Sequence, residues 1–277
     1  MASLLNYTAV TPPQGGAASW LLALHGIYGS GRNWGTIARR LVQKRPDWGV
    51  LLVDLRLHGE STAGFSPPHT VAAAAADIAE LVAVEGLAAT AVLGHSFGGK
   101  VALEYARGHG EGLRQVWAVD STLNASEPSG SAWQVLQAVR SLPDRFPSRE
   151  ALIEGLGRHG HPPELASWLG MNLERADGEL RWRLDWDGVE EMLRDYFRTD
   201  VWEVVEAPPD DVEVHVLRAT ESSALGPEDV ARIRAAEAAH SRTHIHELVG
   251  GHWIHVDNPD ALVELLTDGL PSATSPG

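Results

Sequence analysis

Residues 90–106 read Thr90-Ala91-Val92-Leu93-Gly94-His95-Ser96-Phe97-Gly98-Gly99-Lys100-Val101-Ala102-Leu103-Glu104-Tyr105-Ala106. An apolar run, a short turn and a helix-forming run follow one another here, and the turn carries Ser96 with a glycine two residues to either side. This order is typical of a nucleophile elbow, a strained turn that exposes a serine hydroxyl. Glycine suits positions 94 and 98 because the sharp turn brings them against neighbouring backbone. A glycine-rich turn without chemistry is the alternative interpretation.

The rhythm of apolar segments along the chain favours an α/β fold. Short strand candidates alternate with longer helical patterns through the first 120 residues, which is typical of a mostly parallel twisted sheet flanked by helices. The expected strands are 20–24, 49–53, 90–93, 115–119, 212–217 and 243–248. The expected helices of this part are 34–44, 71–85 with Thr70 as N-cap, 97–107, 227–239 and one that begins at Pro259.

From residue 123 to residue 206 the strand rhythm stops. Helical patterns recur at 132–141, 150–159, 163–172 and 188–198, and this segment holds half of the chain's ten tryptophans. We expect a helical cap at 123–206, inserted into an α/β-hydrolase core of residues 1–122 and 207–270. The tryptophans favour either an apolar substrate pocket or a small core of the cap itself. Residues 271–277 have the composition of a disordered tail.

Composition limits the partners that we expect. The chain of 277 residues has a formal net charge of −15, which disfavours nucleic acid and anionic membranes because both attract basic surfaces. It has no cysteine, which excludes disulfides, thiolate metal sites and a cysteine nucleophile. The N-terminal residues show no positive stretch followed by an apolar segment of signal-peptide length, so we expect a cytoplasmic protein. The oligomeric state is left open.

A serine nucleophile needs a base, and the base needs a carboxylate to orient it. His252 follows the last expected strand, so it belongs at the same sheet edge as Ser96, and His255 is its close rival. Asp120 directly ends the strand at 115–119, while Glu221 lies just past the next strand. We favour Asp120 as the acid because its side chain is shorter and more rigid, and we keep Glu221 as the alternative.

Two backbone N–H groups are expected to form an oxyanion hole. Phe97 begins the helix after the serine, so its free N–H and the positive end of the helix dipole face the reacting atom. The loop after the first expected strand, His25-Gly26-Ile27-Tyr28-Gly29-Ser30, supplies the N–H of Ile27 as the second donor. His25, and His58 in the turn after the next strand, are interpreted as scaffold residues that make hydrogen bonds.

Three further histidines, His240, His244 and His246, raise the question of a metal. Only His244 and His246 share a strand face, and we find no carboxylate placed with them. We therefore expect neither a metal nor another cofactor.

Four motifs together resemble the α/β-hydrolase superfamily over nearly the whole chain outside the cap. They are His25-Gly26 with Asn33-Trp34, Asp54-Leu55-Arg56-Leu57-His58-Gly59-Glu60-Ser61, Gly94-His95-Ser96-Phe97-Gly98-Gly99-Lys100, and Gly251-His252-Trp253. More narrowly the chain resembles the small esterase and acyl-thioesterase branch, whose elbow continues into Gly-Gly-Lys and whose acid follows the next strand. That resemblance implies Asp120 as the acid. The chain departs from the branch at Ser121-Thr122-Leu123, where a proline-containing turn is more usual.

The sequence therefore predicts a serine hydrolase that cleaves carboxylic esters or acyl thioesters of small molecules through an acyl-enzyme. Carbon–carbon bond hydrolases and cofactor-free haloperoxidases use the same triad and remain alternatives. Dehalogenases and epoxide hydrolases need a carboxylate at the position of Ser96 and are disfavoured. A ligand-binding protein on a hydrolase fold is the non-enzymatic alternative.

Overall fold

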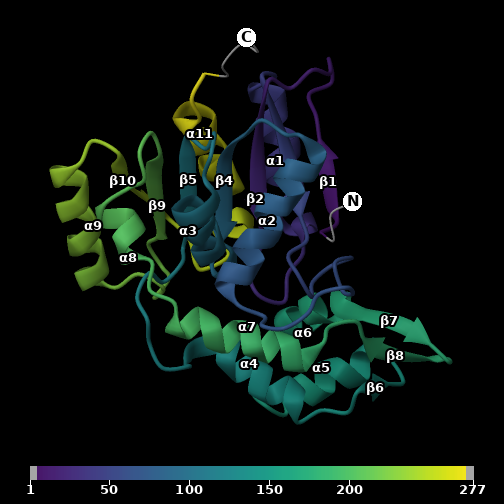
Figure 1. Cartoon of the computed structure of the whole chain (residues 1–277). Helices are drawn as coiled ribbons and strands as arrows, with labels where there is room; N and C mark the ends of the chain where they lie inside the picture. Colours follow the sequence, from purple (N-terminus) through teal and green to yellow (C-terminus); the bar gives the residue numbers. More distant parts are fainter. Residues whose placement is uncertain (1–4, 273–277) are drawn as a thin grey trace.

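The computed structural model describes residues 5–272. A twisted sheet of seven strands forms its centre, in the order β1-β3-β2-β4-β5-β9-β10 (Figure 1). All neighbours pair in parallel except β1, which is antiparallel to β3. The strands are β1 (Tyr7–Val10), β2 (Ser19–Leu24), β3 (Trp48–Val53), β4 (Ala89–His95), β5 (Gln115–Val119), β9 (Glu213–Ala219) and β10 (Thr243–Leu248).

Helices cover both faces of this sheet because its strands alternate apolar side chains between two cores. These helices are η1 (Gly31–Trp34), α1 (Gly35–Lys44), α2 (Val71–Glu85), α3 (Phe97–His109), α8 (Trp202–Glu206), α9 (Pro227–Ala239), α10 (Ile254–Asp257) and α11 (Pro259–Gly269). In β2, Leu22 and Leu24 face the core that includes helices α2, α3 and α9, whereas Leu21 and Ala23 face the core beneath α1 and α11.

The helix ends follow local chemistry. The Thr70 hydroxyl accepts a hydrogen bond from the N–H of Ala73 at the start of α2, as predicted, and Gly86 ends that helix in the left-handed region at φ +61°. Pro259 is the first residue of α11, also as predicted. The predicted helix 34–44 is found as α1, and the separate 3₁₀ turn η1 precedes it and ends at Trp34.

The insertion between β5 and β9 forms a cap over one edge of the sheet (Figure 1). Its helices are α4 (Gly130–Arg140), α5 (Arg149–Gly157), α6 (Pro163–Leu169), the 3₁₀ turn η2 (Gly170–Asn172) and α7 (Trp186–Arg198). The expectation of a purely helical cap is wrong, because β6 (Arg145–Phe146), β7 (Leu173–Ala176) and β8 (Glu179–Trp182) form a small antiparallel sheet. The turn between β7 and β8 is Asp177-Gly178, with φ +54° and +87°. Asp-Gly between two alternating segments is a hairpin signal that we did not use.

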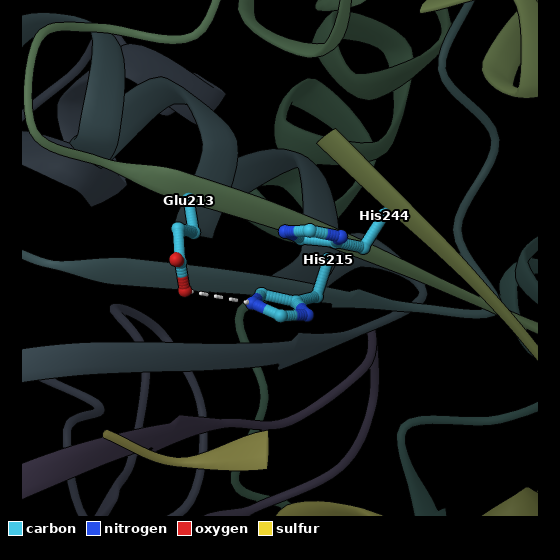
Figure 2. Close-up of side chains that lie close together, drawn as sticks. All are labelled: Glu213, His215 and His244. Carbon is cyan, nitrogen blue, oxygen red and sulfur yellow. Dashed lines mark ion pairs between the residues drawn. The ribbon is translucent and has the colours of Figure 1, made fainter. Parts of the chain in front are cut away.

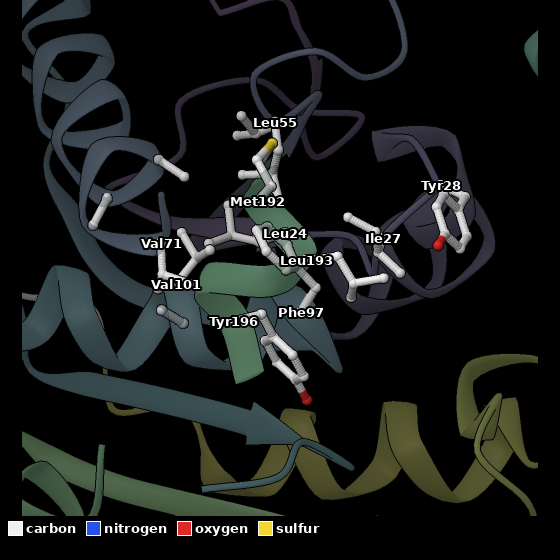
Figure 3. Close-up of a cluster of buried hydrophobic side chains, with 14 of the residues drawn as sticks. Leu24, Ile27, Tyr28, Leu55, Val71, Phe97, Val101, Met192, Leu193 and Tyr196 are labelled. Carbon is white, nitrogen blue, oxygen red and sulfur yellow. The ribbon is translucent and has the colours of Figure 1, made fainter. Parts of the chain in front are cut away.

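Two segments connect the cap closely with the core. Figure 3 shows side chains of α7 packed into the large core cluster, where Met192, Leu193 and Tyr196 meet Leu24, Val71, Phe97 and Val101. The last helix of the predicted cap segment, α8, packs against α3 and α9 of the core instead of the cap helices.

Of the predicted disordered tail, residues 273–277 lie outside the described residues. Pro271, the first residue of that predicted tail, is fixed to the core because its carbonyl accepts a hydrogen bond from Arg45 at 2.6 Å.

Candidate active site

Ser96 lies in a strained turn between β4 and α3. Its φ of +52° and ψ of −115° are unusual for a residue with a side chain. A Cβ on Gly94 would lie 1.9 Å from the Gly98 carbonyl oxygen, and one on Gly98 would lie 2.6 Å from that of His25. The turn therefore requires glycine at both positions, as the sequence predicted. Its backbone is fixed by hydrogen bonds from the Ser96 N–H to the Val119 carbonyl and from the Ser121 hydroxyl to the Ser96 carbonyl.

Asp120 and His252 come together at the carboxyl ends of β5 and β10. Asp120 is fully buried; one carboxylate oxygen accepts the N–H of Ala219 at 3.1 Å, and the other lies 2.7 Å from His252 Nδ1. A proton on Nδ1 leaves Nε2 of His252 as the free acceptor. Glu221, the alternative acid, has an exposed side chain, and its N–H donates to the Gly250 carbonyl. Of the two candidates, Asp120 is the one that contacts His252.

Ser96 and His252 line one pocket between the core and the cap. Within residues 5–272 no direct hydrogen bond joins the Ser96 hydroxyl to His252, a geometry that is common before a substrate binds. The cap contributes Ala132, Val135, Leu165 and Trp168 to the walls, so the space above the serine is largely apolar.

The tryptophans of the cap divide between the pocket and the cap's own packing. Trp168 of α6 lines the pocket and lies against Trp253, the residue after His252, with ring centroids 4.8 Å apart. Trp182 and Trp186 pack edge to face on each other at 5.1 Å. Trp133 packs against Phe197 of α7.

The two predicted oxyanion donors flank the serine. Phe97 is the first residue of α3, so its N–H has no acceptor inside the helix. Ile27 lies in the turn after β2, where Gly26 approaches so closely that a Cβ on it would lie 3.5 Å from Ser96 Cβ. In the same turn the N–H of Tyr28 donates to His58 at 3.1 Å and that of Gly29 to Gly26 at 3.0 Å. Within the described residues the N–H of Ile27 has no such protein acceptor.

His25 and His58 hold this turn in place. His25 Nε2 accepts the N–H of Leu55, and its Nδ1 donates to the Gly26 carbonyl at 2.7 Å. His58 accepts from Tyr28 and donates to the Arg56 carbonyl at 2.9 Å. Each ring therefore carries a single proton, and burial lowers the pKa of His25 to about 4 and that of His58 to about 3. These contacts agree with the scaffold role predicted for both.

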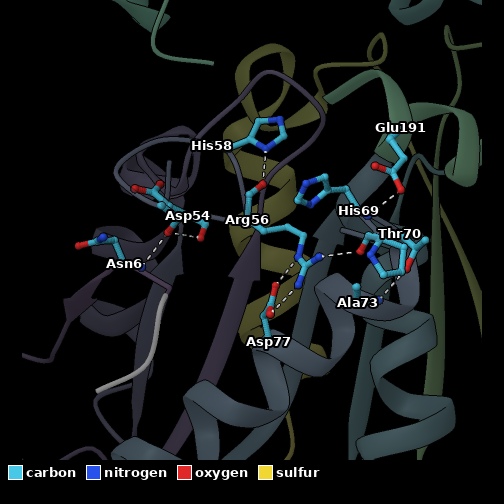
Figure 4. A network of polar contacts seen from close by, with 11 residues as sticks. Asn6, Asp54, Arg56, His58, His69, Thr70, Ala73, Asp77 and Glu191 are labelled. Carbon is cyan, nitrogen blue, oxygen red and sulfur yellow. Dashed lines mark hydrogen bonds and ion pairs between the residues drawn. The ribbon is translucent and has the colours of Figure 1, made fainter. Parts of the chain in front are cut away.

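The segment after β3 supports His58 through a wider polar network (Figure 4). The Arg56 guanidinium pairs with the Asp77 carboxylate of α2 at 2.6 and 2.9 Å, and both side chains are nearly buried. Asp54 accepts the N–H groups of Gly31 and Glu60. The Asp54–Ser61 motif thus anchors the loop after β2, which lines the pocket, and does not itself reach into the pocket.

His95 is a site residue that the sequence analysis did not single out. It is buried, lines the pocket and donates from Nε2 to the His252 carbonyl at 2.7 Å, so it fixes the backbone of the loop that carries the base. His255, the rival base, lies 5.1 Å from His95 and 5.3 Å from Trp34 between ring centroids. Burial lowers the pKa of His255 to about 4. The contact with the Asp120 carboxylate belongs to His252.

Lys100, at the end of the elbow motif, is completely buried. Its ammonium donates to the carbonyls of Asn124, Tyr196 and Thr199 at 2.9, 2.8 and 2.7 Å. Burial lowers its pKa to about 8, and three carbonyl acceptors favour the charged form at neutral pH. These carbonyls belong to the segments that lead into and out of the cap, so Lys100 fastens both to α3.

A second cluster of ionisable side chains lies at the other end of the strands. Glu213 and His215 of β9 and His244 of β10 have ligand atoms within 4.8 Å of one another. The expectation that no carboxylate accompanies the histidines is wrong. It failed because the parallel register sets His244 directly beside His215, and Glu213 precedes His215 by two residues on the same face.

Comparison with known proteins identifies the family. The model of the alpha/beta hydrolase family matches residues 21–265. The chain belongs to the α/β hydrolase family. This confirms the resemblance seen in the motifs, while the narrower Gly-Gly-Lys branch remains a prediction. The family match and the relatives named as lipases support the assignment of the protein as a hydrolase.

This α/β hydrolase is similar to several lipases and to a solved esterase. It is 26% identical over 272 residues to the sn-1-specific diacylglycerol lipase ABHD11 of Danio rerio, covering 96% of this chain and 83% of that protein. It is 28% identical over 168 residues to Lipase LipV of Mycobacterium tuberculosis, covering 59% of this chain and 61% of that one. A solved marine microorganism esterase has the same fold, with a TM-score of 0.81 at 23% identity over 96% of this chain and 99% of that chain.

Among residues 5–272 no helix is both long and apolar enough to cross a bilayer.

Proposed function

We propose that this α/β hydrolase cleaves carboxylic esters or acyl thioesters through an acyl-enzyme formed on Ser96. The 2.7 Å contact between Asp120 and His252, beside a strained serine in the same pocket, carries the proposal. The relatives named as lipases support the ester class. Localisation in the cytoplasm and action without a cofactor remain predictions from the sequence.

In this mechanism Ser96 Oγ attacks the acyl carbonyl carbon while His252 Nε2 takes the hydroxyl proton. The buried Asp120 carboxylate stabilises the imidazolium that forms, because it already accepts from Nδ1. The N–H groups of Ile27 and Phe97 donate to the oxyanion of the tetrahedral intermediate. His252 then protonates the leaving alcohol or thiol, and water releases the acid by the reverse sequence of proton transfers.

The pocket walls favour an apolar acyl group. Trp168, Leu165 and Val135 from the cap and Trp253 from the base loop surround the serine, whereas polar groups are concentrated around the reacting atoms. This is the usual division in a small-molecule site, where apolar walls bind and a few polar groups orient.

The experiment compares labelling and turnover in matched variants. The wild type and Ser126→Ala, an exposed serine of the cap segment, should react with a fluorophosphonate probe and hydrolyse p-nitrophenyl esters. Ser96→Ala should lose both, with kcat lowered by about 10⁴-fold or more. Retained turnover in Ser96→Ala would refute the proposal.

The choice of acid is tested in the same assay. Asp120→Asn should lower kcat by about 10⁴-fold, as the equivalent change does in a serine protease. Glu221→Gln should stay close to the wild type. The reverse result would move the acid to Glu221. Labelling of Ser96 without ester or acyl-CoA hydrolysis would favour the carbon–carbon bond hydrolases instead.

A further inference from the structure

Glu213, His215 and His244 converge at the amino ends of β9 and β10. Figure 2 shows the His244 ring over the His215 ring, with the Glu213 carboxylate facing the edge of His215. His215 lies about 13 Å along β9 from Ala219, the residue that contacts Asp120. This cluster is therefore separate from the pocket.

His215 has one ring nitrogen without a hydrogen-bond partner. The residue is 5% exposed, and its buried Nε2 is unpaired, 3.5 Å from Glu213 Oε2. Its Nδ1 lies 3.0 Å from His246 Nε2. When His215 Nδ1 donates to His246, the Nε2 lone pair faces a carboxylate oxygen, and a cation between the two satisfies both. Two ligands at tetrahedral angles on Zn²⁺, each about 2.0–2.2 Å from the ion, lie roughly 3.4 Å apart.

The residues around Glu213 and His215 orient these two side chains in the way that the outer residues of a metal site orient its ligands. His246 Nε2 lies within hydrogen-bond distance of His215 Nδ1, and Gln115 donates to Glu213 at 2.6 Å. Gln115 is itself held by Trp117 Nε1 at 3.1 Å, and the Trp117 ring stacks on His215 at 4.0 Å. Such contacts orient a ligand and set its tautomer.

We propose that Glu213, His215 and His244 bind one divalent transition-metal ion of the Zn²⁺ class. Two imidazole nitrogens and a carboxylate oxygen suit this class, and the half-exposed Glu213 leaves a fourth position open to water. The ion joins the edge strand β10 to β9. The ion would act away from the pocket, because Asp120's partner Ala219 and the His252 loop lie at the far ends of the two strands that it joins.

The test is calorimetric titration of the chelator-stripped, dialysed protein with ZnCl₂, with the unfolding temperature measured with and without the ion. The wild type should bind one Zn²⁺ per chain and melt at a higher temperature with it. Affinity should fall by at least ~10-fold in His244→Gln and in Glu213→Gln. His240→Gln changes an exposed histidine outside the cluster and should bind as the wild type does.

Three results would overturn the proposal. They are no saturable binding by the wild type, equal binding by all variants, and binding that survives His244→Gln but is lost in His252→Gln, which places the ion in the pocket. Glu213 is at the half-exposed start of β9, so Glu213→Gln provides the test even if His244→Gln does not fold. The readouts do not depend on esterase activity.

Discussion

Replacing Lys100 by methionine should destabilise the fold strongly while leaving its packing almost unchanged. Methionine keeps the apolar stem of the lysine but removes three charge-assisted hydrogen bonds of 2.7–2.9 Å, so the carbonyls of Asn124, Tyr196 and Thr199 lose their donor. Each bond to a charged group contributes about 1.5–3 kcal/mol, and the relieved cost of burying the ammonium offsets part of the sum. We expect a net loss of about 3–5 kcal/mol in the free energy of unfolding.

The measurement is equilibrium unfolding in urea followed by far-UV circular dichroism, together with the melting temperature. For a chain of this size the loss corresponds to a fall of roughly 10 °C in Tm. The chain has two lysines, so Lys44→Met, an exposed residue at the end of α1, is the matched control and should stay within about 0.5 kcal/mol. A change below about 1 kcal/mol in Lys100→Met would refute the reasoning that the ammonium fastens the cap segments.

Three further outcomes follow from single features. Gly94→Ala should prevent folding, because its Cβ would overlap a backbone oxygen at 1.9 Å. Gly108→Ala in α3 is the control: its Cβ meets nothing within 4 Å, and the free energy of unfolding should rise by a few tenths of a kcal/mol. Soluble yield and urea unfolding compare the two variants. The pKa of His58 is about 3 in the folded protein and about 6.5 in the unfolded chain, so the unfolded chain binds more protons as the pH falls. The free energy of unfolding should therefore drop by roughly 2 kcal/mol between pH 6.5 and 5. Urea midpoints across that range should show this slope, and a slope unchanged in His58→Gln would contradict it. Trp168→Ala should raise KM for a p-nitrophenyl octanoate more than for the acetate, because the indole lines the pocket beside Trp253; equal changes would place the acyl chain elsewhere.

The sequence predicted the elements that have strong local signals. The strands of the core are continuous apolar runs buried on both faces, and the helix that begins at Phe97 follows a turn that glycine alone permits. Weak elements were missed for physical reasons. The edge strand Tyr7–Val10 has four mostly exposed residues, and the cap hairpin gave only its Asp177-Gly178 turn as a signal.

Contacts between distant segments could not be derived from the sequence in the same way. The position of Asp120 at a strand end indicated the sheet edge, but the choice over Glu221 depended on where the His252 loop lies in space. Lysine is usually exposed to solvent, so nothing in the sequence indicated a buried side chain at position 100. The three carbonyls that accept from Lys100 belong to residues up to 99 positions away in the chain. Only the three-dimensional register placed His244 beside His215 and Glu213.

The burial of Lys100 also determines how the molecule can be attached to a solid support. Of the two lysines, Lys44 is the exposed one. It lies at the end of α1 just before the start of β3, at the amino ends of the parallel strands, whereas Ser96 lies at their carboxyl ends. Lysine-directed coupling to activated resin will therefore anchor the molecule by the amino ends of these strands, so that the cap and the mouth of the pocket face the surrounding liquid.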